Sequence, residues 1–137
     1  MNSLDTNVLI YAFDPSDTVK HKPAARLLGR ALGERWPIAA QVYGEFFVAT
    51  VRKKIATREL AFEVISTWRR AMPAIESSLA AHEAALALAA QHQLQFWDAL
   101  IIATCAEHGV KKLYTEDLPS LRKPLGVTVE NPFKQKA

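Results

Sequence analysis

The stretch that decides the fold runs from Trp97 to His108: Trp97-Asp98-Ala99-Leu100-Ile101-Ile102-Ala103-Thr104-Cys105-Ala106-Glu107-His108. Its apolar residues lie on nearly every side of a helix, and such a helix is normally surrounded by other parts of the protein. Gly109 follows it as an expected left-handed cap. The sequence therefore predicts a deeply buried helix with one carboxylate, Asp98, in its first turn.

Strand-like and helix-like segments alternate along the rest of the chain. Helices are expected at 6–12, 20–32, after residue 40 and through Glu45 to 53, at 58–72 and at 79–92; the second is amphipathic and is expected to end at Gly33. Short strands are expected at 3–5, 36–40, 73–76, 112–115 and 127–130. Strands separated by helices imply parallel pairing. The predicted fold is a three-layer α/β/α sandwich with a short central parallel sheet, in a single domain spanning residues 1–137.

The composition sets only broad limits on function. A net charge of +3 and a pI near 9.1 favour an anionic partner weakly. The lone cysteine, Cys105, excludes an intramolecular disulfide, and residues 1–5 lack the pattern of a signal peptide. No apolar run approaches the roughly 18 residues that a membrane span needs. We therefore expect a cytoplasmic protein without a membrane partner.

Four acidic residues stand in or beside apolar runs: Asp5, Glu45, Asp98 and Asp117. An ionised carboxylate in such a place costs several kcal/mol unless a cation or hydrogen-bond donors face it. A shared divalent metal ion would supply that cation. Because the carboxyl ends of parallel strands line one crevice in open α/β folds, we expect the four acids to meet there.

Each acid also has an ordinary structural interpretation. Asp5 could cap the helix after the first strand, and Asp98 could cap the amide of Ile101, a role worth about 1 kcal/mol. Glu45 could be a solvent-facing helix residue, and Asp117 could belong to a turn. A shared metal site would be excluded only if all four acids had these structural roles at the same time.

The sequences around the four acids resemble the ordered motifs of the PIN-domain nucleases, and within that family those of the VapC-like ribonuclease toxins. The resemblance covers nearly the whole chain. Its motifs are Leu4-Asp5-Thr6-Asn7-Val8-Leu9-Ile10-Tyr11, Gln41-Val42-Tyr43-Gly44-Glu45-Phe46, Phe96-Trp97-Asp98-Ala99-Leu100-Ile101-Ile102-Ala103 and Leu113-Tyr114-Thr115-Glu116-Asp117-Leu118.

The resemblance implies a site in which Asp5, Glu45, Asp98 and Asp117 are the catalytic carboxylates and hold Mg²⁺ or Mn²⁺. Supporting groups are implied at Thr6, Asn7 and Thr115, and Glu116 competes with Asp117 for the fourth place. The chain departs from the family at Ala39, Ala40 and Gly44, where polar residues are usual. These departures put the capping of the second-motif helix, and the hydrogen bonding around Glu45, in doubt.

The implied activity is metal-dependent hydrolysis of an RNA phosphodiester by the toxin component of a type II toxin–antitoxin pair. The implied partners are RNA, a small VapB-like antitoxin and a second copy of the chain. Two alternatives stay open: a housekeeping PIN-domain RNA-processing nuclease without an antitoxin, and a nucleic-acid-binding module with little activity. Trp36, Trp68 and Trp97 could stack on bases, although tryptophans at helical spacing more often belong to the core.

Overall fold

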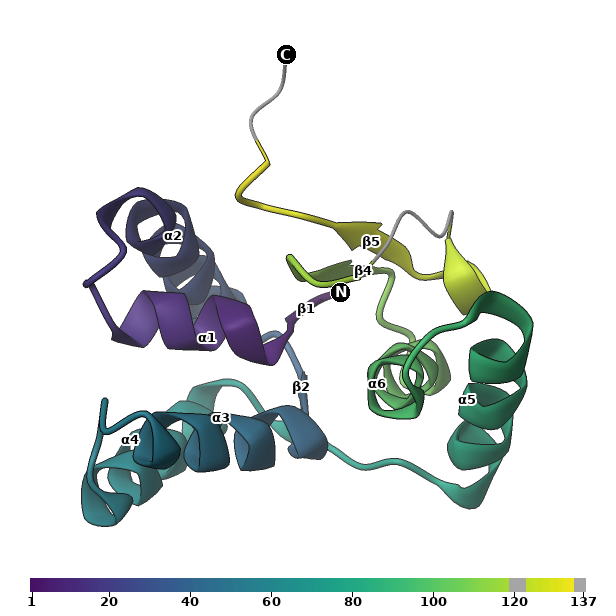
Figure 1. The fold of residues 1–137 in the computed structure, drawn as a ribbon, viewed down its shortest axis with the longest axis horizontal. Helices are drawn as coiled ribbons and strands as arrows, with labels where there is room; N and C mark the ends of the chain where they lie inside the picture. The colour runs from purple at the N-terminus through teal and green to yellow at the C-terminus, as the bar shows by residue number, and fades with distance from the viewer. Residues whose placement is uncertain (119–122, 135–137) are drawn as a thin grey trace.

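A short parallel sheet runs through the centre of the computed structural model, which describes residues 1–118 and 123–134 (Figure 1). Its strands are β1 (Asn2–Leu4), β4 (Lys112–Tyr114) and β5 (Thr128–Glu130), in the order β1-β4-β5. The register pairs Leu4 with Tyr114 and Tyr114 with Glu130. Both pairings are parallel, as the alternation of strands and helices predicts.

A second parallel ladder joins β2 (Ile38–Ala39) to β3 (Ala74–Ile75). It lies beside β1, where the hydroxyl of Ser3 donates to the carbonyl oxygen of Pro37 at 2.6 Å. Ser3 is fully buried, so this bond satisfies a polar group that would otherwise destabilise the core. The two ladders therefore form one central layer.

Helices cover this layer on two sides (Figure 1). On one side, α1 (Thr6–Phe13) packs on α2 (Thr18–Glu34), and α3 (Ala40–Arg52) packs on α4 (Arg58–Ala71). On the other, α5 (Leu79–His92) packs on α6 (Phe96–Glu107), and a short 3₁₀ turn at Pro124–Gly126 leads into β5. The arrangement confirms the predicted α/β/α class with a short parallel sheet.

Several helices begin where the sequence supplies a capping side chain. Asp17 accepts from the amide of Lys20 at the start of α2, Thr57 caps α4 and Ser78 caps α5. Each such cap contributes about 1 kcal/mol, because it satisfies an amide that has no partner within the helix.

The helix from Phe96 to Glu107 is the centre of the core. All of its residues from Ala99 to Cys105 are buried. Burying an isoleucine contributes about 1.5–3 kcal/mol, and Ile101 and Ile102 are both almost completely enclosed. Gly109 has φ +76°, the left-handed conformation expected just beyond this helix. The burial of α6 was thus predictable from its sequence. The buried residues anchor the helix, and with it the first turn that carries Asp98.

The predicted end of the second helix was wrong. The helix continues through Gly33 to Glu34, and the left-handed residue is Arg35, with φ 58°. Trp36 follows with its amide bonded to the carbonyl of Ala31 at 3.0 Å and its side chain in the core. The burial of this tryptophan, rather than the freedom of a glycine backbone, decides where the helix ends.

Across residues 1–118 and 123–134, we find no helix with both the length and the apolar character that crossing a bilayer requires.

Candidate active site

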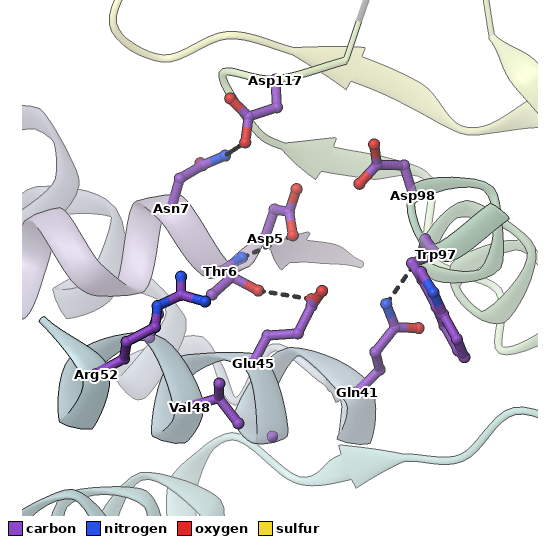
Figure 2. Close-up of a pocket in the computed structure, with 12 residues that line it drawn as sticks. Asp5, Thr6, Asn7, Gln41, Glu45, Val48, Arg52, Trp97, Asp98 and Asp117 are labelled. Carbon is purple, nitrogen blue, oxygen red and sulfur yellow. Dashed lines mark hydrogen bonds between the residues drawn. The ribbon is translucent and has the colours of Figure 1, made fainter. Parts of the chain in front are cut away.

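A cavity of about 640 Å³ opens where the end of β1, one face of α3 and the first turn of α6 meet (Figure 2). All four predicted carboxylates line it: Asp5, Glu45, Asp98 and Asp117. They come from four separate parts of the sequence, and the parallel sheet together with its covering helices brings them together.

Asp5 is the most deeply buried of the four acids, with 5% of its surface exposed. Its Oδ1 accepts from the amide of Thr6 at 2.7 Å, so it caps α1, and its Oδ2 accepts from the hydroxyl of Thr115 at 2.7 Å. Burial raises the pKa of Asp5 to about 6, and the charges of Glu45 and Asp98 add to the rise, while the two hydrogen bonds oppose it. Asp5 therefore caps a helix and lines the cavity at once.

Glu45 lies half-buried on α3 and accepts from the hydroxyl of Thr6 at 3.0 Å. The N-cap of α3 is Ala39, which makes no side-chain hydrogen bond to the helix, as the departure at that position suggested. Ala39, Ala40 and Gly44 have no polar side chain to offer Glu45, and the hydrogen bond from Thr6 holds its carboxylate in place instead.

Asp98 is half-buried in the first turn of α6. The N-cap of this helix is Gln95, and the hydrogen bonds in the described part of the chain include none from the amide of Ile101 to Asp98. Burial raises the pKa of Asp98, and the charges of Asp117 and Glu45 raise it further. Asp98 therefore makes no capping hydrogen bond at the start of α6, and it lines the same cavity as the other three acids.

Asn7 positions the segment that carries Asp117. Its amide nitrogen donates to Oδ2 of Asp117 at 3.0 Å and lies 3.3 Å from the hydroxyl oxygen of Thr115. Its amide oxygen accepts from the backbone of Glu116 at 3.3 Å. One side chain therefore ties three consecutive residues after β4 to the start of α1.

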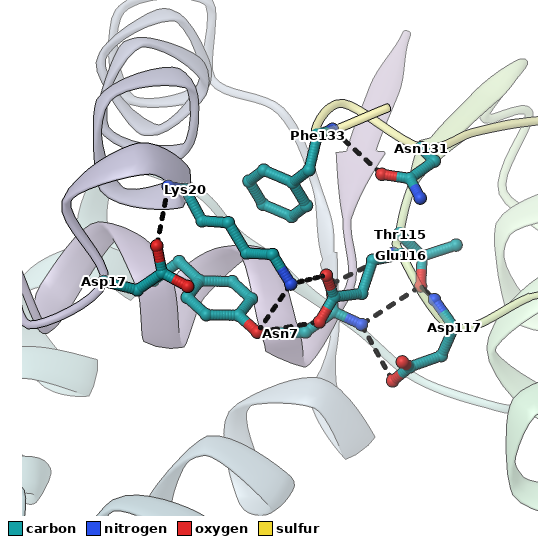
Figure 3. Close-up of polar contacts among 9 residues, drawn as sticks. Asn7, Asp17, Lys20, Thr115, Glu116, Asp117, Asn131 and Phe133 are labelled. Atoms are coloured by element: carbon teal, nitrogen blue, oxygen red, sulfur yellow. Dashed lines mark hydrogen bonds and ion pairs between the residues drawn. The ribbon is translucent and has the colours of Figure 1, made fainter. Parts of the chain in front are cut away.

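Glu116, the alternative fourth acid, has other partners (Figure 3). It forms an ion pair with Lys20 at 2.7 Å and accepts from the hydroxyl of Tyr11 at 2.8 Å. Lys20 also lies 5.0 Å from the centre of the Tyr11 ring and 5.8 Å from that of Phe133. Glu116 does not line the 640 Å³ cavity, and Asp117 does. The two candidates thus have different surroundings: Glu116 contacts Tyr11 of α1 and Lys20 of α2, and Asp117 lines the cavity with the other acids.

The charges of the four cavity acids are not neutralised by the ion pairs of the described residues, which join Lys20 to Glu116, Arg30 to Glu34, His108 to Glu107 and Lys112 to Glu130. Nor do three acid, histidine or cysteine side chains lie close enough to hold one ion within residues 1–118 and 123–134. Mg²⁺ keeps several waters and needs only one or two protein carboxylates. The donor set, all hard carboxylate oxygens with unneutralised charge, therefore fits such an ion.

Sequence reasoning did not assign several residues that line the same cavity. Gln41, Val48 and Arg52 lie on the face of α3 that carries Glu45, and Trp97 precedes Asp98. The amide nitrogen of Gln41 donates to the backbone oxygen of Trp97 at 3.0 Å, which links α3 to α6. Steps of three and four residues from Glu45 along α3 would have indicated this face.

The fold and the site together define a class of protein: an α/β domain with four acids around one cavity. The family model of the PIN domain matches residues 3–119 of this chain. The chain belongs to the PIN domain family. A search of curated protein sequences gives no significant match.

Solved structures of similar fold cover nearly the whole chain. A chain of a toxin–antitoxin complex from Klebsiella pneumoniae is 26% identical with a TM-score of 0.69, over 96% of this chain and 98% of that one. VapC20 from Mycobacterium tuberculosis, a Sarcin-Ricin loop cleaving toxin, is 18% identical with a TM-score of 0.66, over 85% and 90%. VapBC2 from Rickettsia felis is 16% identical with a TM-score of 0.69, over 95% and 97%. At 18% and 16% identity, the last two establish the shared fold alone.

Proposed function

We propose that this protein is a metal-dependent endoribonuclease and the toxin component of a toxin–antitoxin pair. The observation that carries the proposal is the set of four acids around one cavity, whose charges the described ion pairs leave unneutralised. Membership of the PIN domain family supports a nuclease. The similarity to a chain of the Klebsiella pneumoniae toxin–antitoxin complex supports the toxin.

Asp5, Glu45, Asp98 and Asp117 surround the cavity that would hold Mg²⁺ or Mn²⁺, with one or two of them as direct ligands and the others reaching the ion through its waters. When bound, such an ion lowers the pKa of a coordinated water and neutralises charge on the reacting phosphate. The protein's own contribution is to hold the carboxylates in place and to keep them ionised. The two hydrogen bonds to Asp5 favour its charged form against the effect of burial.

Three neighbouring polar residues act on the carboxylates rather than on the substrate. Thr115 and Thr6 orient Asp5 and Glu45 through their hydroxyls, and Asn7 orients Asp117. Groups of this kind fix the direction of metal-binding oxygens, and removing one typically costs 10–100-fold in metal affinity or activity. Thr6, Asn7 and Thr115 are therefore positioning residues in this proposal.

The proposed partners are an RNA substrate, a small VapB-like antitoxin and a second copy of this chain. The cavity is acidic, so a cationic side chain of the antitoxin could neutralise Asp5, Glu45 and Asp98 in place of metal. Val48 and Trp97 add exposed apolar surface at the same cavity, which a peptide segment could cover.

Expression of the chain alone in a bacterial host is expected to arrest growth and to produce defined breaks in cellular RNA. Asp5→Asn should remove both effects because it removes a carboxylate from the cavity. Glu83→Gln, a change at an exposed carboxylate on α5, should keep both. Growth curves and primer-extension maps of the RNA measure the outcome, and co-expression of the small protein encoded beside this chain should restore growth by direct binding.

If the protein is instead a housekeeping RNA-processing nuclease, another combination of results is expected. RNA would be cleaved in vitro, expression would be harmless, and no neighbouring protein would bind. A pure binding module would retain RNA without cutting it. Either result would replace the toxin assignment.

The two acids after β4 provide a matched pair of variants. Asp117→Asn is expected to lower RNA cleavage by at least about 10-fold, as the loss of a group at a metal site does. Glu116→Gln should leave the cleavage rate nearly unchanged, because its partners are Lys20 and Tyr11. Its effect on stability should stay below about 1 kcal/mol, since the ion pair is partly exposed. Initial rates and thermal melts measure both, and the reverse ranking of the two rates would assign the fourth place to Glu116.

A further inference from the structure

One large aromatic side chain stands in solvent beside the acids. Of the three tryptophans, Trp36 is 3% exposed and Trp68 is 8% exposed, and both belong to the core. Trp97 is 59% exposed and lines the cavity next to Asp98 (Figure 2). The structure therefore separates the three candidates for base stacking, and Trp97 alone among them has an accessible ring.

The position of Trp97 is fixed although its ring is exposed. It lies in the first turn of the buried helix α6, and its backbone oxygen accepts from the amide of Gln41 at 3.0 Å. The ring meets that of Phe96 in an edge contact, with centroids 5.0 Å apart and planes at 74°. An indole held in this way loses little conformational freedom when a flat group stacks on it, which favours binding.

A positive charge lies at the other end of the cavity. Arg52, also a lining residue, is exposed at the last turn of α3, eleven residues beyond Gln41. At the helical rise this separation is about 16 Å, room for several nucleotides of a stacked strand. No ion pair of Arg52 occurs among the described residues. Glu45 lies on α3 between the two ends (Figure 2).

We propose that Trp97 stacks on an unpaired base of the substrate while Arg52 binds a backbone phosphate, so that a single-stranded segment of RNA crosses the acids between them. The proposal rests on the proposed ribonuclease function and names the residues that position its substrate. Stacking suits any base, since every base has a flat π face, and a cation at a phosphate adds affinity that depends on salt. A duplex hides the base faces, so the contact with Trp97 requires an unpaired base.

The test uses the full chain with Mn²⁺, a single-stranded RNA and a duplex of the same sequence. Trp97→Ala should lower kcat/KM for the single strand by about 10-fold, mainly through KM, and Trp97→Phe should recover most of the loss. Arg52→Gln should weaken binding for all sequences and reduce the slope of log affinity against log salt by about 0.7. Phe62→Ala, at an exposed aromatic residue on α4, and Arg70→Gln, at an exposed arginine of the same helix, are the matched controls and should behave as wild type.

Tryptophan emission gives a second readout that does not depend on cleavage. Rapid mixing with single-stranded RNA should quench wild-type emission, and should not quench that of Trp97→Phe, whose remaining tryptophans are buried. The inference would be overturned if wild type cleaves RNA, Trp97→Ala and Arg52→Gln keep the wild-type KM, and RNA quenches Trp97→Phe as much as wild type. The ribonuclease proposal would then stay intact. Failure of wild type to bind or cleave RNA at all would overturn both.

Discussion

Replacing Asp98 with asparagine is expected to lower metal-dependent RNA cleavage by at least about 100-fold, because even the outer partners of a metal site contribute 10–100-fold. Asparagine has nearly the same volume as aspartate but carries no charge, so the protein loses one anionic ligand and little packing. Ala99 to Cys105 keep α6 buried whatever stands at position 98. The fold should therefore survive. Initial rates with saturating Mn²⁺ measure the loss, and a thermal melt tests the fold.

The control for Asp98→Asn is Glu83→Gln, which makes the same chemical change at an exposed carboxylate of α5. It should cleave RNA at the wild-type rate. An Asp98→Asn protein with full activity would remove Asp98 from the site. A variant that is merely unfolded would also count against a catalytic Asp98, since it would assign the residue to the fold.

Asp5→Asn is expected to stabilise the metal-free protein at neutral pH while it abolishes cleavage. The pKa of Asp5 rises from its ordinary value of 3.8 to about 6, mainly through burial, so its ionisation opposes folding. That difference corresponds to about 3 kcal/mol in the free energy of unfolding above pH 6. The variant avoids this cost but weakens the bond from Thr115, which is worth about 1 kcal/mol. The expected net gain is about 2 kcal/mol, measured by denaturant unfolding in EDTA.

The pH dependence identifies the cause of that gain. Between about pH 4 and pH 6 the folded wild type binds more protons than the unfolded chain, so its free energy of unfolding falls as the pH rises. The raised pKa of Asp98 acts in the same direction. Asp5→Asn should lose most of this slope, and the two proteins should differ little below pH 4. Equal slopes in both proteins would show that Asp5 is not a source of the destabilisation.

The fold was largely predictable because its main determinants are local patterns. The apolar sides of α6 predicted its burial, and the alternation of strands and helices predicted parallel pairing. The end of α2 was not predictable from Gly33, since the burial of Trp36, whose ring stacks on that of Tyr114, decides it. Helix ends depend on packing partners that are distant in sequence, which local patterns do not contain.

The four acids could be found in the sequence because each stands in or beside an apolar run and lies in a motif that resembles those of one family. The choice between Glu116 and Asp117 could not, since both follow β4 and only their partners distinguish them. Those partners, Lys20 and Asn7, are about a hundred residues away in the chain. Trp97 was predicted only as one of three tryptophans that could stack on bases, and Arg52 was missed, because their exposure beside the acids becomes visible only when α3 and α6 meet.

The most direct test of the account is RNA cleavage by one preparation of the purified protein, first in excess EDTA and then after Mn²⁺ or Mg²⁺ is added back. The four carboxylates repel one another without a cation and supply hard oxygen ligands for a divalent ion. We therefore expect no cleavage in EDTA and full recovery with either ion in wild type, and no recovery in Asp98→Asn. Cleavage that persists in excess EDTA, or that returns equally in wild type and Asp98→Asn, would contradict a metal-dependent ribonuclease at this cavity.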